Sequence, residues 1–146
     1  MSTVSKKKQF NKIATGYHQL KHGDRPHQVS DSILTKPTIP VPDKPEAEVL
    51  AECLTWLKEH RIQAWRMNVG AGVLGGTFAK FGIVGSADIT GILPDGRRLE
   101  IEAKKGKGGW LSEEQLKYKK NIQENRGVYL IVHGLAELEV LMEPYI

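Results

Sequence analysis

The sequence lacks the features that mark secreted or membrane-bound proteins. It contains a single cysteine, Cys53, which excludes a disulfide within the chain and suits a reducing compartment. Cys53 lies in a helical apolar pattern, so we expect a small buried residue rather than a nucleophile. No apolar run is long enough to span a bilayer, and no apolar segment follows the N-terminal lysines as in a signal peptide. We therefore expect a cytoplasmic protein with no membrane partner.

Two common cofactor motifs are missing as well. The glycine-rich stretch GAGVLGGTFAKFG, residues 70–82, lacks the Gly-Lys-Ser/Thr ending of a P-loop, so we expect no nucleotide cofactor. His18, His22 and His27 are irregularly spaced and have no cysteine nearby, which argues against a metal site in the N-terminal region.

Positive charge is concentrated near the N-terminus. Residues 1–45 hold eight Lys or Arg and three Asp, a net charge of +5, whereas residues 46–146 carry −1. Five prolines between residues 26 and 45 oppose helix and favour an extended linker. We expect residues 1–45 to be a basic arm with little fixed structure unless a partner orders it. Basic arms often bind nucleic acid, but a solvated tail explains the charge equally well.

Beyond this arm the apolar pattern changes between helix and strand periods. It predicts helices over residues 45–61, 111–127 and 134–146, strands over 62–69, 86–93, 97–104 and 128–133, and a loop over 70–85. We expect Ser112 to cap the middle helix and Gly127 to end it. The order α-β-β-β-α-β-α predicts a mixed α/β domain, residues 46–146, built on one sheet.

The residues Pro94-Asp95-Gly96 separate the second and third predicted strands. They suit a three-residue hairpin loop, with glycine where the loop requires positive φ. Alternation along the two strands then separates a core face from a polar face. The core face holds Ala87, Ile89, Leu99, Ile101 and Ala103, and the polar face holds Asp88, Thr90, Glu100, Glu102 and Lys104.

This register makes Asp88 and Glu102 direct neighbours, with Cβ atoms roughly 5 Å apart. Two carboxylates so placed repel each other, and a shared hard cation such as Mg²⁺ would turn the repulsion into binding. Lys104 shares the face and could steady an attacking water or charge developing on phosphorus. The alternative is a solvent-facing strand on which Lys104 relieves the two acids. A one-residue shift or a bulge would also remove the pairing.

The ordered motifs over about residues 45–142 resemble the PD-(D/E)XK nuclease superfamily, and within it the VRR-NUC group of phage and repair nucleases. The family's first helix and strand are similar to PEAEVLAECLTWLKEHRIQAWRMNVGAG. Its catalytic hairpin and following helix are similar to GSADITGILPDGRRLEIEAKKGKGGWLSEEQ. The first motif departs from the family's Pro-Asp form, since Ala87 precedes Asp88. The long glycine-rich loop also departs from the smallest members, and residues 1–45 lie outside the resemblance.

The resemblance implies a restriction-endonuclease-like core and a set of site residues. Asp88 and Glu102 match the motif acids, Lys104 the motif lysine, Gln115 a glutamine of the following helix, and Glu46 the first-helix acid, with Glu48 as its alternative. Asp88, Glu102, Glu46 and the Ala103 carbonyl would hold Mg²⁺ or Mn²⁺. Gln115 also fits a capping box with Ser112, which is an independent structural role.

By this resemblance the chain is a metal-dependent endonuclease that cuts branched or structured DNA, in a bacterial or phage-infected cell. Dimerisation would let it cut two strands. The alternatives are a nucleic-acid-binding module without catalysis and a nuclease that acts on RNA. The residues expected to contact nucleic acid are Arg66, Asn68, Lys80, Lys105 and Lys107. Trp110 would either stack on a base or pack beneath the helix that follows it.

Overall fold

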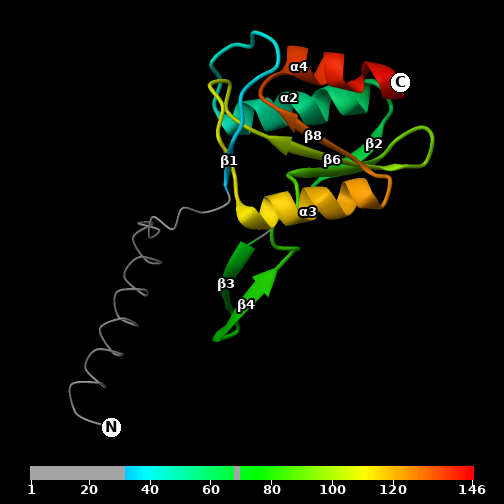
Figure 1. Cartoon of the computed structure of the whole chain (residues 1–146). Helices are drawn as coiled ribbons and strands as arrows, with labels where there is room; N and C mark the ends of the chain where they lie inside the picture. The colour runs from blue at the N-terminus through cyan, green and yellow to red at the C-terminus, as the bar shows by residue number, and fades with distance from the viewer. Residues whose placement is uncertain (1–31, 68–69) are drawn as a thin grey trace. The chain divides into compact units, whose positions relative to one another are not determined.

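The computed structural model describes residues 32–67 and 70–146 (Figure 1). These residues form a mixed α/β protein with three α-helices, a four-strand sheet and two small two-strand sheets. The elements are β1 (Ile33–Leu34), α2 (Glu46–Glu59), β2 (Gln63–Arg66), β3 (Gly70–Leu74), β4 (Thr77–Phe81), β5 (Ile89–Ile92), β6 (Arg98–Ala103), β7 (Trp110–Leu111), α3 (Glu113–Glu124), β8 (Val128–Val132), α4 (Leu135–Met142) and the 3₁₀ helix η1 (Glu143–Tyr145). No helix in the described residues is long and apolar enough to cross a membrane.

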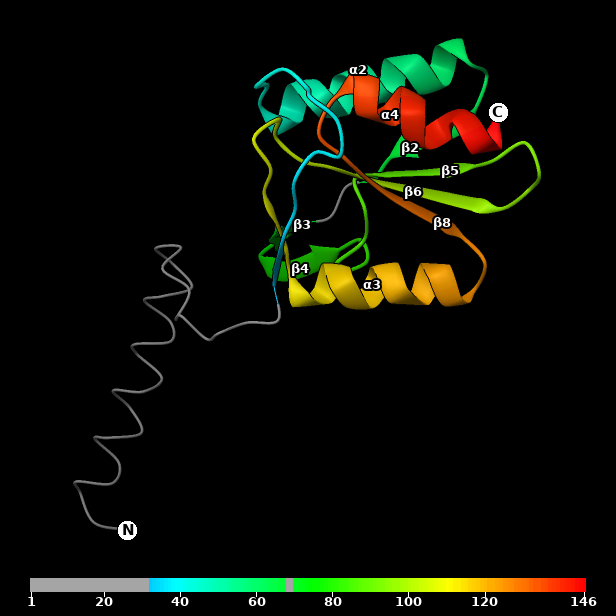
Figure 2. The same cartoon turned by 45° about the horizontal axis from the view of Figure 1, so that its top comes forward.

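The main sheet has the strand order β2-β5-β6-β8. The pairs β2–β5 and β5–β6 are antiparallel, whereas β8 runs parallel to β6. A parallel neighbour requires a crossover connection, and α3 provides it. Helices α2 and α4 cover one face of this sheet and α3 covers the other (Figure 2). The mixed α/β class and the order of the predicted helices and main-sheet strands are confirmed. The prediction of a single sheet is wrong, because the β1–β7 and β3–β4 pairs form separate small sheets.

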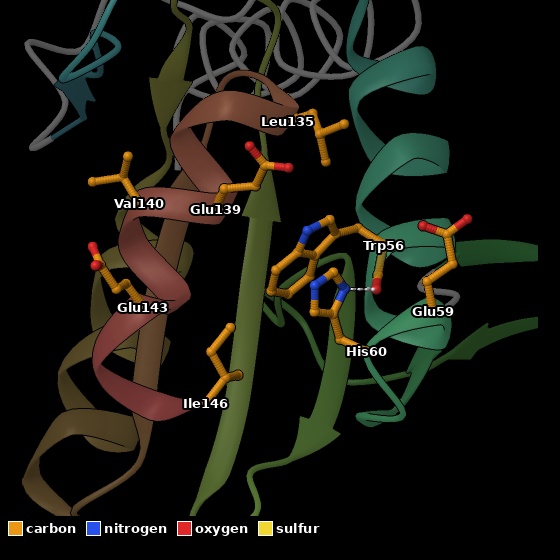
Figure 3. A pocket seen from close by; sticks show the side chains of 8 residues that line it. All are labelled: Trp56, Glu59, His60, Leu135, Glu139, Val140, Glu143 and Ile146. Atoms are coloured by element: carbon orange, nitrogen blue, oxygen red, sulfur yellow. Dashed lines mark hydrogen bonds between the residues drawn. The ribbon is translucent and has the colours of Figure 1, made fainter.

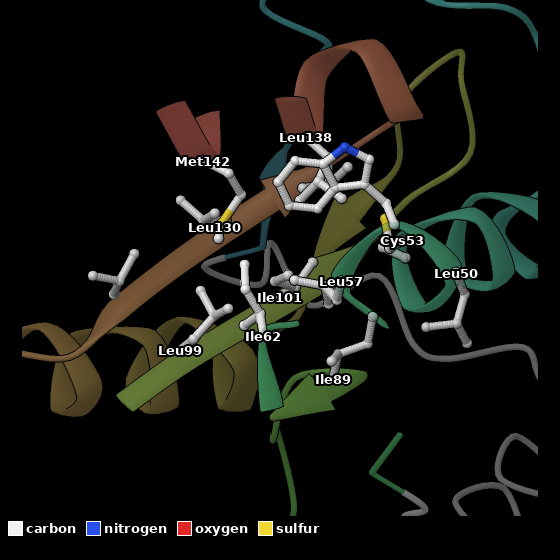
Figure 4. Packing of buried hydrophobic residues seen from close by; sticks show 14 of the residues in the cluster. Leu50, Cys53, Leu57, Ile62, Ile89, Leu99, Ile101, Leu130, Leu138 and Met142 are labelled. Atoms are coloured by element: carbon white, nitrogen blue, oxygen red, sulfur yellow. The ribbon is translucent and has the colours of Figure 1, made fainter. Parts of the chain in front are cut away.

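The hydrophobic core lies between the sheet and the α2–α4 layer (Figure 4). Helix α2 contributes its apolar stripe, and the strands contribute alternate residues. The buried members include Val49, Leu50, Cys53, Leu57, Ile89, Leu99, Ile101, Val132, Leu138 and Met142. Cys53 is fully buried, and its burial raises the pKa of the thiol to about 12. The expectation that it is a packing residue is confirmed.

The predicted hairpin register is confirmed. Ile89 pairs with Ile101 and Thr90 with Glu100. The Leu93 N–H donates to the Arg97 carbonyl at 2.9 Å across the three-residue loop. Gly96 has φ 87°, which is the conformation that the loop requires of it.

The polar face of the hairpin is covered by α3 rather than by solvent. Thr90, Glu100, Glu102 and Lys104 are all buried. The prediction that Ala87 lies on the core face is wrong. Ala87 packs with Ile122 and Tyr129 in a second cluster on the α3 side. Residue 87 precedes β5, so strand alternation does not govern it.

The glycine-rich segment is a hairpin, where the sequence predicted a loop. Strands β3 and β4 pair along their whole length, from Gly70–Phe81 to Leu74–Thr77. Gly75 and Gly76 form the two-residue turn with φ of 56° and 81°, a conformation that glycine adopts readily. The many glycines hide the alternation by which a strand is recognised.

Residues 32–45 are tied to the main unit, although the sequence predicted little fixed structure there. Strand β1 pairs with β7, and the Thr35 N–H donates to the Gly109 carbonyl at 2.6 Å. Gly106 approaches this segment so closely that a Cβ there would lie 2.0 Å from the Pro42 carbonyl oxygen. These partners are distant in sequence, so local pattern does not reveal them. Residues 1–31 lie outside the described residues.

The end of α3 also differs in detail from the prediction. Its C-cap is Asn125, and Arg126 rather than Gly127 adopts the left-handed conformation, with φ 64°. Ser112 caps the other end of the helix as predicted.

Candidate functional site

Four of the predicted site residues meet at one end of the β5–β6 hairpin. Asp88 lies directly before β5, Glu102 lies near the end of β6, and Lys104 follows that strand. Gln115, in the first turn of α3, approaches from the helix that covers this face. The hairpin loop fixes the register of the two acids, and the crossover after β6 brings the helix over them.

Glu102 is the central group of this site, and only 2% of it is exposed. Its Oε1 accepts hydrogen bonds from Lys104 Nζ at 2.8 Å and from Gln115 Nε2 at 2.6 Å. Its Oε2 is buried and has no hydrogen-bond partner among the residues that the structure describes. Burial raises the pKa of Glu102 to about 7, Asp88 adds repulsion, and Lys104 opposes both. A buried carboxylate oxygen without a donor is costly, and Glu100 Oε2 is in the same state. Glu102 differs in having the charge of Asp88 beside it, so its position suits a cation.

Asp88 is held against the end of β6. Its Oδ2 accepts the backbone N–H of Ala103 at 2.8 Å. Burial raises the pKa of Asp88, although the Ala103 hydrogen bond and the charges of Lys104 and Arg66 counteract part of the shift. Asp88 in turn raises the pKa of Glu102, so the two carboxylates sense each other's charge. Negative charge at this end of the hairpin therefore exceeds what Lys104 neutralises.

Lys104 is unusual for a lysine because it is buried. Its backbone N–H donates to the Val132 carbonyl at 2.8 Å, which fixes the start of the side chain beside β8. Its stem passes over Gly109, where a Cβ would lie 3.4 Å from Lys104 Cδ. These contacts hold the ammonium at Glu102 and restrict its motion, in contrast to the mobile side chain of a surface lysine.

Gln115 performs both of the roles considered from the sequence. Its Oε1 accepts the Ser112 N–H at 2.9 Å, and its own N–H donates to Ser112 Oγ at 3.2 Å, which completes the capping box. Its Nε2 remains available and donates to Glu102. The cap therefore orients the amide that holds the acid.

Glu46 is the first-helix acid whose charge reaches the site. It contributes to the raised pKa of Glu102, whereas Glu48 acts on Lys44 instead. Glu46 is nevertheless exposed. Across residues 32–67 and 70–146, no group of three or more His, Cys, Asp or Glu is arranged to hold a metal ion. The acidic donors brought together are thus the pair Asp88 and Glu102, beside the Ala103 backbone.

The predicted nucleic-acid contacts are less tightly gathered. Arg66 ends β2, and its positive charge lowers the pKa of Asp88. Lys105 is exposed beside the site, whereas Lys107 pairs with Asp43 at 2.9 Å. Residue 80 lies in β4, where it pairs with residue 71 of β3.

Two further predictions concern Asn68 and Trp110. Asn68 lies outside the described residues. Trp110 is 61% exposed, which is inconsistent with packing beneath α3.

Glu100 is a second buried carboxylate on the same face, and the sequence did not predict a role for it. Glu100 Oε1 accepts hydrogen bonds from Thr90 Oγ1 at 2.5 Å, Arg98 Nε at 2.5 Å and Tyr118 OH at 3.0 Å. This cluster connects α3 to the hairpin at Glu100, which lies two residues before Glu102 on the same face of β6. The available signal was the pattern Glu-x-Glu-x-Lys on one strand face.

A third polar group anchors residues 32–45. His133 Nδ1 lies 2.8 Å from Glu137 Oε2, and His133 Nε2 lies 3.0 Å from Thr35 Oγ1. Glu137 Oε1 accepts the Thr38 N–H at 2.8 Å. Burial disfavours the ionised form of Glu137, but these backbone and side-chain donors outweigh it and lower the pKa. The spacing of His133 and Glu137, four residues apart, was the only sequence signal.

A cavity of about 560 Å³ lies elsewhere, between α2 and α4 (Figure 3). The rings of Trp56 and His60 stack there with centroids 3.7 Å apart. Carboxylates surround them, namely Glu59, Glu139 and Glu143. This cavity contains none of the predicted site residues, and its acidic lining is unsuited to a polyanion.

No protein-family model matches this chain, and the searches of curated proteins and of solved structures found no match either. The functional interpretation therefore depends on the residues and their geometry.

Proposed function

We propose that this chain is a metal-dependent endonuclease of the PD-(D/E)XK type that hydrolyses phosphodiester bonds in branched or structured DNA. The observation that carries the proposal is the convergence of Asp88, Glu102, Lys104 and Gln115 on one buried site. A buried Glu102–Lys104 pair beside a half-buried Asp88 has no evident value for stability, because buried charges are costly even when they are paired. The hairpin that presents both acids, and the crossover helix above it, support a restriction-endonuclease-like core.

The donors of this site fit a divalent cation. Burial has raised the pKa of both carboxyl groups, and one oxygen of Glu102 has no hydrogen-bond partner. Asp88 and Glu102 would hold the ion, with the Ala103 carbonyl and Glu46 as the further proposed donors. Mg²⁺ commonly takes only one or two protein carboxylates and fills its remaining positions with water and substrate phosphate. When bound, Mg²⁺ or Mn²⁺ supplies positive charge that polarises the phosphate and acidifies water.

Lys104 and Gln115 have distinct roles in this proposal. The Lys104 ammonium has three N–H donors, of which Glu102 takes one at 2.8 Å. The others can orient the attacking water or stabilise negative charge that develops on the phosphate oxygens. Gln115 does not meet the substrate and acts as a positioning residue, because its amide fixes the orientation of Glu102.

Two cationic side chains near the site support a polyanionic substrate, because Arg66 and Lys105 are both exposed. The net positive charge of the chain lies in residues 1–45, whereas residues 46–146 carry −1. Phosphate contacts supply most of the affinity of proteins for nucleic acid, and they require such cationic groups. The acidic cavity between α2 and α4 belongs to the opposite side of the main sheet from α3.

The proposal is tested by incubating the purified chain with end-labelled flapped duplex in Mg²⁺, Mn²⁺ or EDTA. We expect cleavage with either metal and none in EDTA. Lys104→Ala should lower the cleavage rate by about 10²-fold or more. Lys120→Ala is the matched control, because Lys120 is exposed on α3, and its rate should stay within about twofold of the parent rate.

Four outcomes of this assay, extended to DNA binding and to a matched RNA, oppose the proposal. Cleavage that survives EDTA, or that Lys104→Ala leaves unchanged, would exclude the mechanism. DNA binding without cleavage under every metal would indicate a binding module without catalysis. Preferential cleavage of a matched RNA would reassign the substrate.

A further inference from the structure

The β3–β4 hairpin carries large apolar side chains that are half or more exposed. Val73 is 70% exposed, Phe78 65% and Phe81 51%. Ile83 and Val84, which follow the hairpin, are exposed as well. Exposed apolar groups gathered in one place mark interaction surfaces more often than chance. The hairpin is therefore a candidate interaction surface.

The hairpin presents apolar groups on both of its faces. Val73 and Phe78 are cross-strand partners and so share one face. Phe81 belongs to the other face and pairs with Gly70, where a Cβ would lie 2.5 Å from the Phe81 ring. Glycine at this position lets the ring lie flat across the neighbouring strand. The result is a thin two-strand ribbon with an aromatic ring available on each side.

The base of this ribbon is fixed at the candidate site. Before β3, the Met67 N–H donates to the Asp88 carbonyl at 2.7 Å. After β4, Gly85 packs against the backbone of Glu114. A Cβ at residue 85 would lie 2.4 Å from the Glu114 carbonyl oxygen. Glu114 directly precedes Gln115. Among the described residues, β2 thus ends beside the site, the ribbon lies beyond the start of α3, and the chain after β4 returns at Asp88 (Figure 1).

The proposed site binds a phosphodiester, and the aromatic ribbon starts beside that site. A single ligand that could contact both is DNA with unpaired bases. Bases inside an intact duplex are stacked, so their faces are closed to a protein ring. Bases at a flap, fork or junction are unpaired and can stack on aromatic side chains, which binds them without regard to sequence. Arg66 at the base of the ribbon is placed to meet the adjoining backbone.

We propose that the β3–β4 hairpin, through Phe78 and Phe81, stacks on unpaired bases at a branch point and thereby selects branched DNA over continuous duplex. This inference depends on the proposed nuclease function, and it names the element that recognises the substrate. A protein partner or a second copy of the chain would cover the same surface by apolar packing. Those occupants require no preference for unpaired bases, so they predict different results.

The test measures equilibrium binding of the full chain to a flapped duplex and to a continuous duplex of the same sequence. The flapped duplex carries 2-aminopurine at the branch, and Ca²⁺ replaces Mg²⁺. We compare the parent chain with Phe78→Ala, Phe81→Ala and Phe78→Trp. The control is Val140→Ala, which removes an equally exposed apolar side chain from α4.

Each Phe→Ala change should weaken binding to the flapped duplex about tenfold and leave binding to the continuous duplex within about twofold. The 2-aminopurine fluorescence should be quenched by the parent chain and by Phe78→Trp, and less so by the Ala variants. The slope of log affinity against log salt should not change, because no phosphate contact is lost. Val140→Ala should behave as the parent chain does.

The inference is overturned if the Ala variants keep the preference for flapped DNA, or if they weaken both duplexes equally. It is also overturned if they dissociate a dimer while the preference persists. In these cases cleavage by the parent chain in Mg²⁺ leaves the nuclease proposal intact. If the parent chain neither binds nor cleaves any DNA, both proposals fail.

Discussion

At the scale of single residues, Glu102 holds the main electrostatic conflict of the molecule. Within residues 32–67 and 70–146, it is buried beside Asp88, one of its oxygens has no hydrogen-bond partner, and only Lys104 supplies a compensating full charge in contact with it. Proteins retain such arrangements at functional sites, where strongly shifted pKa values are common. The conflict has measurable consequences for stability even before any substrate is present.

The first consequence is a pH dependence of folding. The pKa of Glu102 is raised from 4.5 to about 7, so between these values the folded chain keeps a proton that the unfolded chain has released. Raising the pH through this window should therefore destabilise the metal-free protein, on the order of 3 kcal/mol from this group. Urea unfolding in EDTA between pH 5 and 8 measures the effect. Glu102→Gln should remove this part of the slope, and equal slopes in the two proteins would contradict the assignment.

At the scale of elements, the start of α3 joins a structural role to a functional one. Ser112 and Gln115 form the cap, but only Gln115 also contacts Glu102. Ser112→Ala should cost about 1 kcal/mol of stability and leave cleavage within about twofold. Gln115→Ala should cost a similar amount of stability and also raise the Mg²⁺ concentration needed for half-maximal cleavage. The same Mg²⁺ titration for both variants would assign Gln115 to capping alone.

Residues 32–45 provide a second test at this scale, because they pack closely on the loop after β6. Gly106→Ala would place a Cβ 2.0 Å from the Pro42 carbonyl oxygen, so it should destabilise the fold by about 2 kcal/mol or more. Gly72→Ala is the matched control, because a Cβ there meets no atom within 4 Å, and it should change stability by less than about 0.5 kcal/mol. Thermal unfolding distinguishes them, and equal melting temperatures would refute the close packing.

The elements also explain what sequence can and cannot predict. Pro94, Asp95 and Gly96 specify a loop by local chemistry, so the register of β5 and β6 could be predicted. Asp88 lies just before the paired residues, and its electrostatic effect on Glu102 is consistent with the predicted neighbourhood. The burial of the polar face could not, since it depends on where α3 packs. The β3–β4 hairpin has too many glycines for visible alternation. Strand β1 forms only through contacts with residues about 75 positions away.

At the scale of the whole molecule, charge is divided between regions. The acidic pair lies beneath α3, further carboxylates line the α2–α4 cavity, and much of the positive charge belongs to the N-terminal residues. Removing residues 1–31, which leaves β1 in place, should lower DNA affinity and the magnitude of its salt slope if this segment meets phosphates. Binding titrations at several salt concentrations measure both. Unchanged affinity and slope would exclude the segment as a DNA contact.

The central claim is that Asp88 and Glu102 share a divalent ion. A crystal structure of the protein soaked in Mn²⁺ tests it most directly, because manganese is located by its anomalous scattering. The account predicts an ion bound between the Asp88 and Glu102 carboxylates, with the previously unpartnered Oε2 of Glu102 among its ligands. Manganese bound at another place would contradict this claim. The claim would also be contradicted if a protein that cleaves DNA bound no manganese and both carboxylates kept their hydrogen bonds to Ala103 and Lys104.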